Sequence, residues 1–92
     1  MLVEWDEEKA ATNKRKHQGI TFEEAATVFD DPLATTINDP DHSEEEQRLL
    51  TTGMSDRNNV LIVAHTFWDG RIRLISARKT TRLERRVYEE GE

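Results

Sequence analysis

The segment VLIVAHTFWDGRIRLISARK, residues 60–79, carries the strongest structural signal in this 92-residue chain. Two runs rich in apolar and β-branched residues, 60–68 and 71–79, flank the dipeptide Asp69-Gly70. Asp-Gly suits the positive φ angles of a two-residue type I′ turn, which joins neighbouring antiparallel strands. The segment therefore predicts a β-hairpin.

The two-residue turn also sets the expected pairing between the hairpin strands. Counting outward from the turn, His65 faces Leu74, and Leu61 lies near Arg78 on the same face of the sheet. Both faces are apolar toward one end of the hairpin, which predicts central strands that are covered on each side. In this pairing His65 is either a hydrogen-bonded core residue or a proton carrier.

Helix caps and turn residues outline the rest of the chain. Asp6 suits the N-cap of a first helix, and T-x-x-E capping boxes at Thr21 and Thr81 predict where two further helices begin. The expected elements are a strand at 2–5, helices at 7–17 and 22–29, strands at 33–37, 48–55, 60–68 and 71–79, and a helix from 82 to about 90.

These elements predict an α+β fold, with a βαα segment, a four-strand antiparallel sheet and a C-terminal helix. A chain of this length can bury one modest core, so residues 1–92 are expected to form one domain. The absence of cysteine leaves stability to packing, as is usual in a reducing cytoplasm. The start MLVEWDEEK lacks the features of a signal peptide, and no stretch approaches membrane-spanning length. We therefore expect a cytoplasmic protein without a membrane partner.

Charge is divided unevenly along the chain. Residues 1–70 hold six basic and fifteen acidic residues, whereas residues 71–86 hold seven of the thirteen basic residues and a single acid. Because a ligand within a Debye length responds to the local patch, a net charge of −6 does not exclude a polyanionic partner. The acidic stretch 23–46 would repel a polyanion toward the basic half, contact a basic partner, or simply be solvated. His42, within that stretch, is interpreted as part of a solvated loop and not as a metal ligand.

The basic segment 71–86 has two interpretations. Several of its residues lie near the N-terminus of the last expected helix, where positive charge opposes the helix dipole. An anion bound by free N–H groups and guanidinium groups would reverse that cost, which predicts a phosphate site. Alternatively, i,i+4 pairs such as Arg85–Glu89 and Arg86–Glu90 make a solvated helix face.

Several common catalytic motifs are absent from the chain. It has no G-x-S-x-G, P-loop, H-E-x-x-H or dinucleotide fingerprint, so nucleotide-driven and serine-hydrolase chemistry are not expected. Cleavage of RNA by its own 2′-OH needs only a base, an acid and positive charge over the phosphorus. Arg, Lys and His side chains supply all three without a metal or cofactor.

Four separated motifs resemble those of the BrnT family. They are WDEEK…N…KH, FEEAATVFDDP, DHSEEEQR and IRLISARKTTRLERRVYE, in colinear order over nearly the whole chain. The resemblance implies a compact α+β toxin of a bacterial type II toxin–antitoxin module, similar in fold to RelE-type ribonucleases. It also implies RNA as the substrate, metal-independent endoribonuclease activity, and inhibition by a ribbon-helix-helix antitoxin similar to BrnA. The pair would bind operator DNA only as a complex.

The resemblance indicates site residues as well. Its KH motif falls on Lys16 and His17, which would transfer protons, with His65 as a further catalytic candidate. Its ISAR motif ends at Arg78, the expected clamp on the phosphate and the transition state. The residues expected to support the RNA phosphates are Arg73, Lys79, Arg82 and Arg85.

A second class of function uses the same basic residues. In this alternative the chain is a non-catalytic subunit whose basic segment binds an acidic part of the antitoxin. Only the complex would then touch operator DNA, with the chain acting as a co-repressor. Antitoxin binding that survives the loss of toxicity in Arg78→Ala would favour catalysis, whereas loss of binding alone would favour docking.

Overall fold

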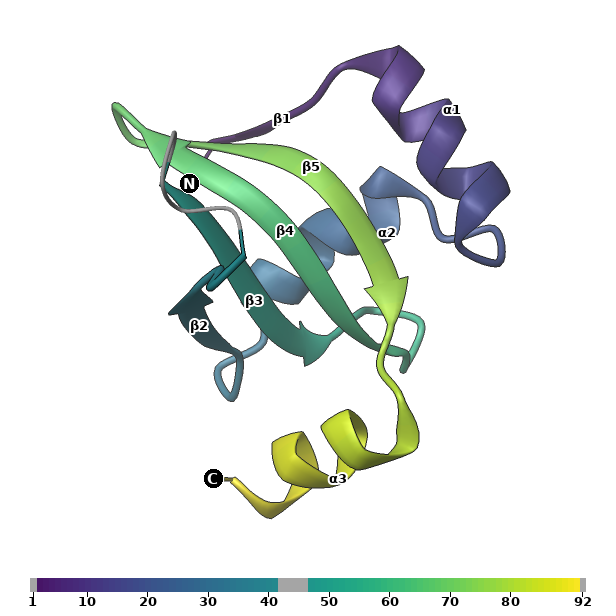
Figure 1. Cartoon of the computed structure of the whole chain (residues 1–92), viewed down its shortest axis with the longest axis vertical. Coiled ribbons are helices and arrows are strands. Elements are labelled where there is room, and N and C mark those ends of the chain that lie inside the picture. The colour runs from purple at the N-terminus through teal and green to yellow at the C-terminus, as the bar shows by residue number, and fades with distance from the viewer. Residues whose placement is uncertain (1, 42–46, 92) are drawn as a thin grey trace.

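A computed structural model describes residues 2–41 and 47–91 of the chain. It contains a five-stranded sheet in the order β1-β5-β4-β3-β2 (Figure 1). The described elements are β1 (Leu2–Glu4), α1 (Glu7–Lys16), α2 (Phe22–Ala26), the 3₁₀ helix η1 (Thr27–Asp30), β2 (Thr35–Asn38), β3 (Arg48–Met54), β4 (Val60–Trp68), β5 (Arg71–Lys79) and α3 (Arg82–Glu90). His42 and the acids that follow it, residues 42–46, lie outside the described residues. No helix in the described ranges is both long enough and apolar enough to cross a membrane.

The expected order of elements is confirmed, but the first strand has a different role. β2 to β5 pair antiparallel, as expected, and β1 adds a fifth strand that runs parallel to β5. In this pairing Leu2 lies opposite Arg71, and Glu4 lies opposite Arg73. The sheet is therefore mixed, within the α+β class that the sequence predicts.

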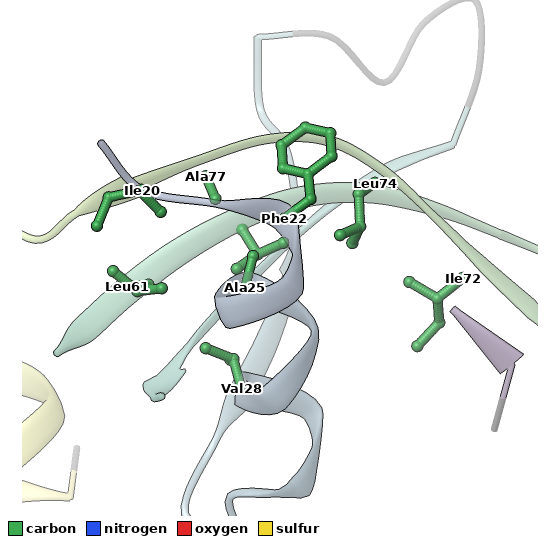
Figure 2. Close-up of a cluster of buried hydrophobic side chains, with 9 residues drawn as sticks. Ile20, Phe22, Ala25, Val28, Leu61, Ile72, Leu74 and Ala77 are labelled. Atoms are coloured by element: carbon green, nitrogen blue, oxygen red, sulfur yellow. The ribbon is translucent and has the colours of Figure 1, made fainter. Parts of the chain in front are cut away.

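One face of the sheet packs against α2 and η1. Figure 2 shows this core, in which Phe22 from α2 and Leu61 from β4 are fully buried. Trp5 extends the core with an edge-to-face contact to Phe22, with ring centroids 6.1 Å apart. The core residues are Ile20, Phe22, Ala25, Val28, Leu61, Val63, Ile72, Leu74 and Ala77. Because this face is filled, a site open to a substrate has to lie at the ends of the sheet or on its other face.

The helices begin where the capping residues predict. Asp6 accepts a hydrogen bond from the backbone at the start of α1, and Thr81 and Glu84 form a complete capping box at α3. At α2, Thr21 accepts from the Glu24 N–H, but the Glu24 carboxylate bonds to the loop between β3 and β4 instead of closing the box. The expected helix over 22–29 is an α-helix only as far as Ala26 and then continues as η1.

The hairpin contains a β-bulge that the sequence analysis did not predict. Asp69 and Gly70 form the turn with φ angles of 52° and 75°, and both values suit the expected type I′ geometry. The pairing follows the expected register as far as His65 opposite Leu74, and then it shifts by one residue. Ile75 is the extra residue of β5 at this point.

The bulge reverses the faces of the residues that follow it. Because successive strand residues point to opposite sides, one extra residue moves every later side chain to the other face. Ala77 therefore enters the core, and Arg78 lies opposite Ile62 on the face away from α2. The expected placement of Leu61 near Arg78 is wrong, because Leu61 pairs with Lys79.

The second face of the sheet, which carries Leu50, Ile62 and Arg78, is called the outer face below. In Figure 1, α2 lies behind the sheet, whereas α3 lies below it, beyond the end of β5. A hollow separates α3 from Leu50 and Ile62 on this face. The expected cover on both sides of the hairpin is therefore complete on the α2 side only.

Candidate functional site

A cleft of about 320 Å³ lies between the end of α1, the end of β5 and the start of α3. It brings Lys16 and His17 together with Arg78 and Lys79, although the two pairs are far apart in the sequence. These are the residues on which the KH and ISAR motifs fall. The lining residues are Lys16, His17, Gln18, Arg78, Lys79, Thr80 and Thr81.

A tight reversal of the chain after α1 sets the position of His17 at the cleft wall. His17 is the C-cap of α1, and its backbone N–H donates to the carbonyl of Asn13 at 2.9 Å. Gln18 and Gly19 then take φ angles of 57° and 79°, a left-handed conformation that is common after helices. Ile20 follows and is buried in the core. The reversal is thus anchored on both sides, and the half-buried His17 lies between the two anchors.

Asn13 holds α1 against the last strand. Its buried side-chain amide donates to the carbonyls of Ala77 and Ile20 at 2.9 and 3.1 Å, and its oxygen accepts from the Ala77 N–H at 2.8 Å. Sequence reasoning did not assign a role to this residue. The available signal was its polar character on the stripe that α1 turns toward the protein, where an apolar residue is usual. Asn13 fixes the turn of α1 that carries Lys16 and His17 relative to β5.

Arg78 is held by a carboxylate. Its Nη1 and Nη2 atoms each donate to Glu84 at 2.9 Å, and Nη1 also donates to the carbonyl of Lys79 at 3.2 Å. The hydrogen bonds from Arg78 lower the pKa of Glu84 to about 2, and those bonds raise the pKa of Arg78. Glu84 also accepts from the Thr81 N–H at 2.8 Å. One carboxylate therefore ties the end of β5 to the first turn of α3.

Two arginines that precede Arg78 in β5 lie outside the cleft. Arg73 and Arg71 face Glu4 of β1 at 2.9 and 3.5 Å. Four residues lie between Arg73 and Arg78, which places the two roughly 16 Å apart along the strand. Arg73 does not line the cleft, and it pairs with Glu4, which the parallel pairing of β1 brings beside it. The expected contact of Arg73 with an RNA phosphate stays a prediction.

The arginines of α3 also point away from a shared anion site. Arg85 pairs with Glu89 at 2.9 Å and Arg86 pairs with Glu90 at 3.6 Å, both at i,i+4 spacing. Arg82 is exposed in the first turn of the helix and does not line the cleft. The interpretation of this part of the chain as a solvated helix face fits the structure, and the expected phosphate contacts of Arg82 and Arg85 do not lie at the cleft.

Lysine side chains supply unpaired positive charge at the cleft. Within the described part of the chain, neither Lys16 nor Lys79 has a carboxylate within ion-pair distance. Thr80 and Thr81 add hydroxyl groups to the wall, and α3 begins there with the positive end of its dipole. An anion can therefore meet ammonium groups in the cleft before Arg78 exchanges its bond to Glu84 for one to a phosphate.

His65 is part of the core. It is 3% exposed, its Nε2 lies 2.8 Å from the Thr51 hydroxyl, and its ring packs edge-to-face on Phe29 with centroids 4.9 Å apart. Burial lowers its pKa, which favours the neutral imidazole. The bulge places Arg78 on the opposite face of the sheet. His65 therefore cannot reach a substrate in the cleft, and of the two interpretations the structure supports the hydrogen-bonded core residue.

A shallow groove along α1 continues from the cleft. It measures about 300 Å³, runs between α1 and β5, and shares Lys16 and His17 with the cleft. Its other lining residues are Glu8, Lys9, Thr12, Asn13, Ile75 and Ser76. Lys16 and His17 therefore lie where two hollows meet, an arrangement that suits an extended polymer passing over them.

The arrangement suits acid–base chemistry on a phosphodiester. Imidazole groups exchange protons near neutral pH, and ammonium and guanidinium groups stabilise negative charge that develops in a transition state. In the ranges 2–41 and 47–91, no three His, Cys, Asp or Glu side chains lie close enough together to hold a metal ion.

Comparisons with known proteins support the same class of chemistry. The family model described as "Ribonuclease toxin, BrnT, of type II toxin-antitoxin system" matches residues 5–84. The crystal structure of the Brucella abortus ribonuclease toxin BrnT is similar to this chain with a TM-score of 0.68. The two share 24% sequence identity over 89% of this chain and 99% of that one, so this likeness concerns the fold alone. No curated protein matches the chain.

Proposed function

The chain belongs to the BrnT family of ribonuclease toxins of type II toxin–antitoxin systems, and from this premise we propose that it is an endoribonuclease whose active site is the cleft between α1, β5 and α3. The observation that carries the proposal is the meeting of Lys16 and His17 with Arg78 and Lys79 in one hollow. Separate elements carry these residues, so only the family motifs, and no local pattern, predicted that they act together.

The proposed reaction uses the RNA as its own nucleophile. The 2′-oxygen attacks the neighbouring phosphorus, the bond from phosphorus to the 5′-oxygen breaks, and a 2′,3′-cyclic phosphate and a 5′-hydroxyl result. His17 and Lys16 are the groups placed to accept the proton of the 2′-OH and to return one to the leaving oxygen. Lys79 and Arg78 stabilise the charge on the phosphorane. Each proton that leaves the substrate is thus replaced, and no metal ion is needed.

Arg78 can contact a phosphate of the RNA while it keeps part of its bonding to Glu84. A guanidinium group has five N–H donors, and the pair with Glu84 uses only the Nη atoms. A phosphate at the cleft would compete with Glu84 for the side chain. Glu84 therefore sets how readily Arg78 moves to the substrate.

Cleavage of a short RNA by the purified chain in the presence of EDTA tests the proposal. His17→Ala and Lys16→Ala should each slow cleavage by about 100-fold or more, the usual effect of removing a proton-transfer group. Arg86→Ala is the matched control, because Arg86 is an exposed base of α3 outside the cleft. Full activity of His17→Ala would reject the cleft, and activity that appears only when divalent ions are added would reject the metal-independent mechanism.

The family implies a protein antitoxin as partner. The finer proposal is a ribbon-helix-helix antitoxin similar to BrnA, which inhibits the chain in the cytoplasm and brings it to operator DNA as a complex. The resemblance of the motifs to the BrnT family supports this assignment. Induction of the chain without the antitoxin should arrest growth, and co-expression should restore it.

A second candidate function is a non-catalytic subunit whose basic segment docks the antitoxin and which acts as a co-repressor in the operator complex. Five of the seven bases in 71–86 face a carboxylate, so the segment has fewer free cations for phosphate than its composition suggests. The same pairing also leaves fewer cations for an acidic segment of the antitoxin. Arg78→Ala separates the two, because loss of toxicity with antitoxin binding intact fits catalysis only.

A further inference from the structure

A groove of about 660 Å³ lies between α3 and the outer face of the sheet and is called the α3 groove below. Its floor is formed by half-buried side chains, Leu50 from β3 and Ile62 from β4. One wall is the side of α3 that carries Leu83 and Val87. The opposite wall is the segment from Pro32 to Ile37.

The walls of the α3 groove expose large apolar side chains to solvent. Leu33 is 71% exposed, Ile37 is 61%, Leu83 is 67% and Val87 is 45%. Single exposed apolar residues are common, but four around one hollow form a patch of the kind that marks interaction sites. The groove therefore has the exposed apolar surface that is typical of an interaction site.

The apolar side of the helix α3 is likewise exposed. It has nine residues, its apolar residues gather on one side, and none of its residues is buried. Helices this short gain most of their stability from packing an apolar face. α3 is held instead by its capping box, by the pair of Glu84 with Arg78, and by a hydrogen bond from the Tyr88 hydroxyl to Asp31. A partner in the groove would supply the missing apolar contact.

Charge indicates which partner suits the groove. The charged residues that line it are Glu84, Glu89 and Arg78, so the lining carries a small excess of negative charge in a chain whose net charge is −6. A second copy of the chain would bring the same negative charge, which is unfavourable. A segment with apolar side chains flanked by Lys or Arg is complementary. A toxin of a type II system acts together with a protein antitoxin, so a protein partner is required in any case.

The α3 groove is in direct contact with the proposed active site. Arg78 lines both the groove and the cleft, and Glu84 lines the groove while bonding to Arg78. A partner that fills the groove would therefore press on the ion pair that limits the movement of Arg78. Occupation of the groove could act on the cleft without covering Lys16 or His17.

We propose that the α3 groove docks a segment of the antitoxin that presents apolar side chains between basic residues, and that the docked segment holds Arg78 against Glu84. The docking stands on the groove itself, whereas its inhibitory effect rests on the proposed RNA cleavage at the cleft.

The test uses the full chain and the protein antitoxin that the family implies, purified separately. Leu83→Asp and Val87→Asp place a carboxylate in the apolar wall, and both should weaken binding by roughly 100-fold, as for a central interface residue. Trp68→Asp is the matched control, because Trp68 is 80% exposed but lies at the hairpin turn outside the groove. The control should bind within about threefold of the unchanged chain. Circular dichroism checks that each variant is folded.

Hydrogen exchange and RNA cleavage complete the test. Antitoxin binding should slow amide exchange over 82–90 and 33–37, and free Val87→Asp should cleave RNA at the original rate but resist inhibition. Unchanged affinity in both groove variants would overturn the proposal. It would equally be overturned if Val87→Asp dissociated a dimer of the free chain while leaving antitoxin affinity intact. If no form of the chain cleaves RNA but Val87→Asp still loses the antitoxin, the proposed enzyme fails and the docking site stands.

Discussion

The side chain of Asn13 forms hydrogen bonds with the backbone of β5, as the backbone of a neighbouring β-strand would. Its amide both donates to and accepts from the backbone of Ala77, and it also donates to the carbonyl of Ile20. No aliphatic side chain of similar size can make these bonds. The residue therefore ties together the two elements that bear Lys16 and Arg78.

Replacing Asn13 with Ala should lower the free energy of unfolding by about 3 kcal/mol, because buried backbone groups lose their partners. Urea denaturation measures the change. Lys14→Ala, at the exposed neighbouring position, is the control and should stay within about 0.5 kcal/mol of the unchanged chain. A loss below about 1 kcal/mol for Asn13→Ala would mean that water replaces the amide, and α1 would then not depend on this residue for its position.

His65 makes the stability of the fold depend on pH. Its pKa is lowered from 6.5 by burial, so the unfolded chain takes up a proton at a pH where the folded chain does not. The contribution to stability is complete above the unfolded value and is lost as the pH falls below it. Between pH 7.5 and 5.5 the free energy of unfolding should therefore fall by up to about 1.4 kcal/mol. His65→Gln should show a flatter profile over the same range, and an identical slope would contradict this assignment.

At the scale of elements, the bulge at Ile75 decides which side chains of β5 reach the cleft. If Ile75 instead paired with Ala64 in a regular ladder, Ser76 and Arg78 would continue the row of Ile72 and Leu74 into the core. The bulge instead directs Arg78 outward to Glu84 and the cleft. The irregularity in the strand is therefore a requirement of the site.

Deleting Ile75 should leave the chain folded, because Ser76 would then follow Leu74 directly, pair with Ala64 in a regular ladder and leave Ala77 and Arg78 on their present faces. Ile75→Ala keeps the chain length and the bulge, and it should also remain folded. Circular dichroism and thermal unfolding measure both variants. Loss of cooperative unfolding in the deletion variant alone would show that the bulge itself, and not only the number of residues, is needed to hold the end of β5.

Patterns among near neighbours in the sequence predict most of the elements. Most features that these patterns did not predict depend on contacts between distant segments. The strands over 60–68 and 71–79 and the start of α3 follow from the Asp-Gly turn and a capping box, which involve near neighbours only. The parallel pairing of β1 depends on a partner from the far end of the chain. The bulge lies within the hairpin, but the Asp-Gly turn sets the register only as far as His65 and Leu74. The cleft was predictable in part, because the family motifs indicated Lys16, His17 and Arg78. The ion pairs of the arginines depend on tertiary pairing that no local pattern reveals.

At the scale of the whole molecule, ion pairs with carboxylates offset much of the positive charge of the basic segment. The net charge is −6, and most arginines of the basic segment already face a carboxylate. The cations available to a phosphate chain at the cleft are Lys16, Lys79 and, by exchange with Glu84, Arg78. RNA binding should consequently be weak and local.

The dependence of RNA affinity on salt measures how many cations take part. Single strands lose affinity with a log–log slope of about −0.7 for each phosphate neutralised. Three cations predict a slope of about −2, whereas all seven bases of residues 71–86 would give about −5. Fluorescence anisotropy with a 2′-O-methyl RNA, which cannot be cleaved, provides the measurement. Lys79→Ala should reduce the slope by about 0.7, and a slope near −5 would show that the paired arginines exchange their carboxylates for phosphates.

Arg78 forms part of two hollows at once, and this shared wall constrains how such a toxin can evolve. Under the two proposals, a lineage that escaped its own antitoxin by changing residue 78 would lose the proposed phosphate clamp in the same step. Recognition of new antitoxins is therefore expected to diversify at the far wall of the α3 groove, around Leu33 and Ile37, where substitutions leave the guanidinium untouched. A substitution of Arg78 would thus change both the proposed RNA cleavage and the proposed response to the antitoxin.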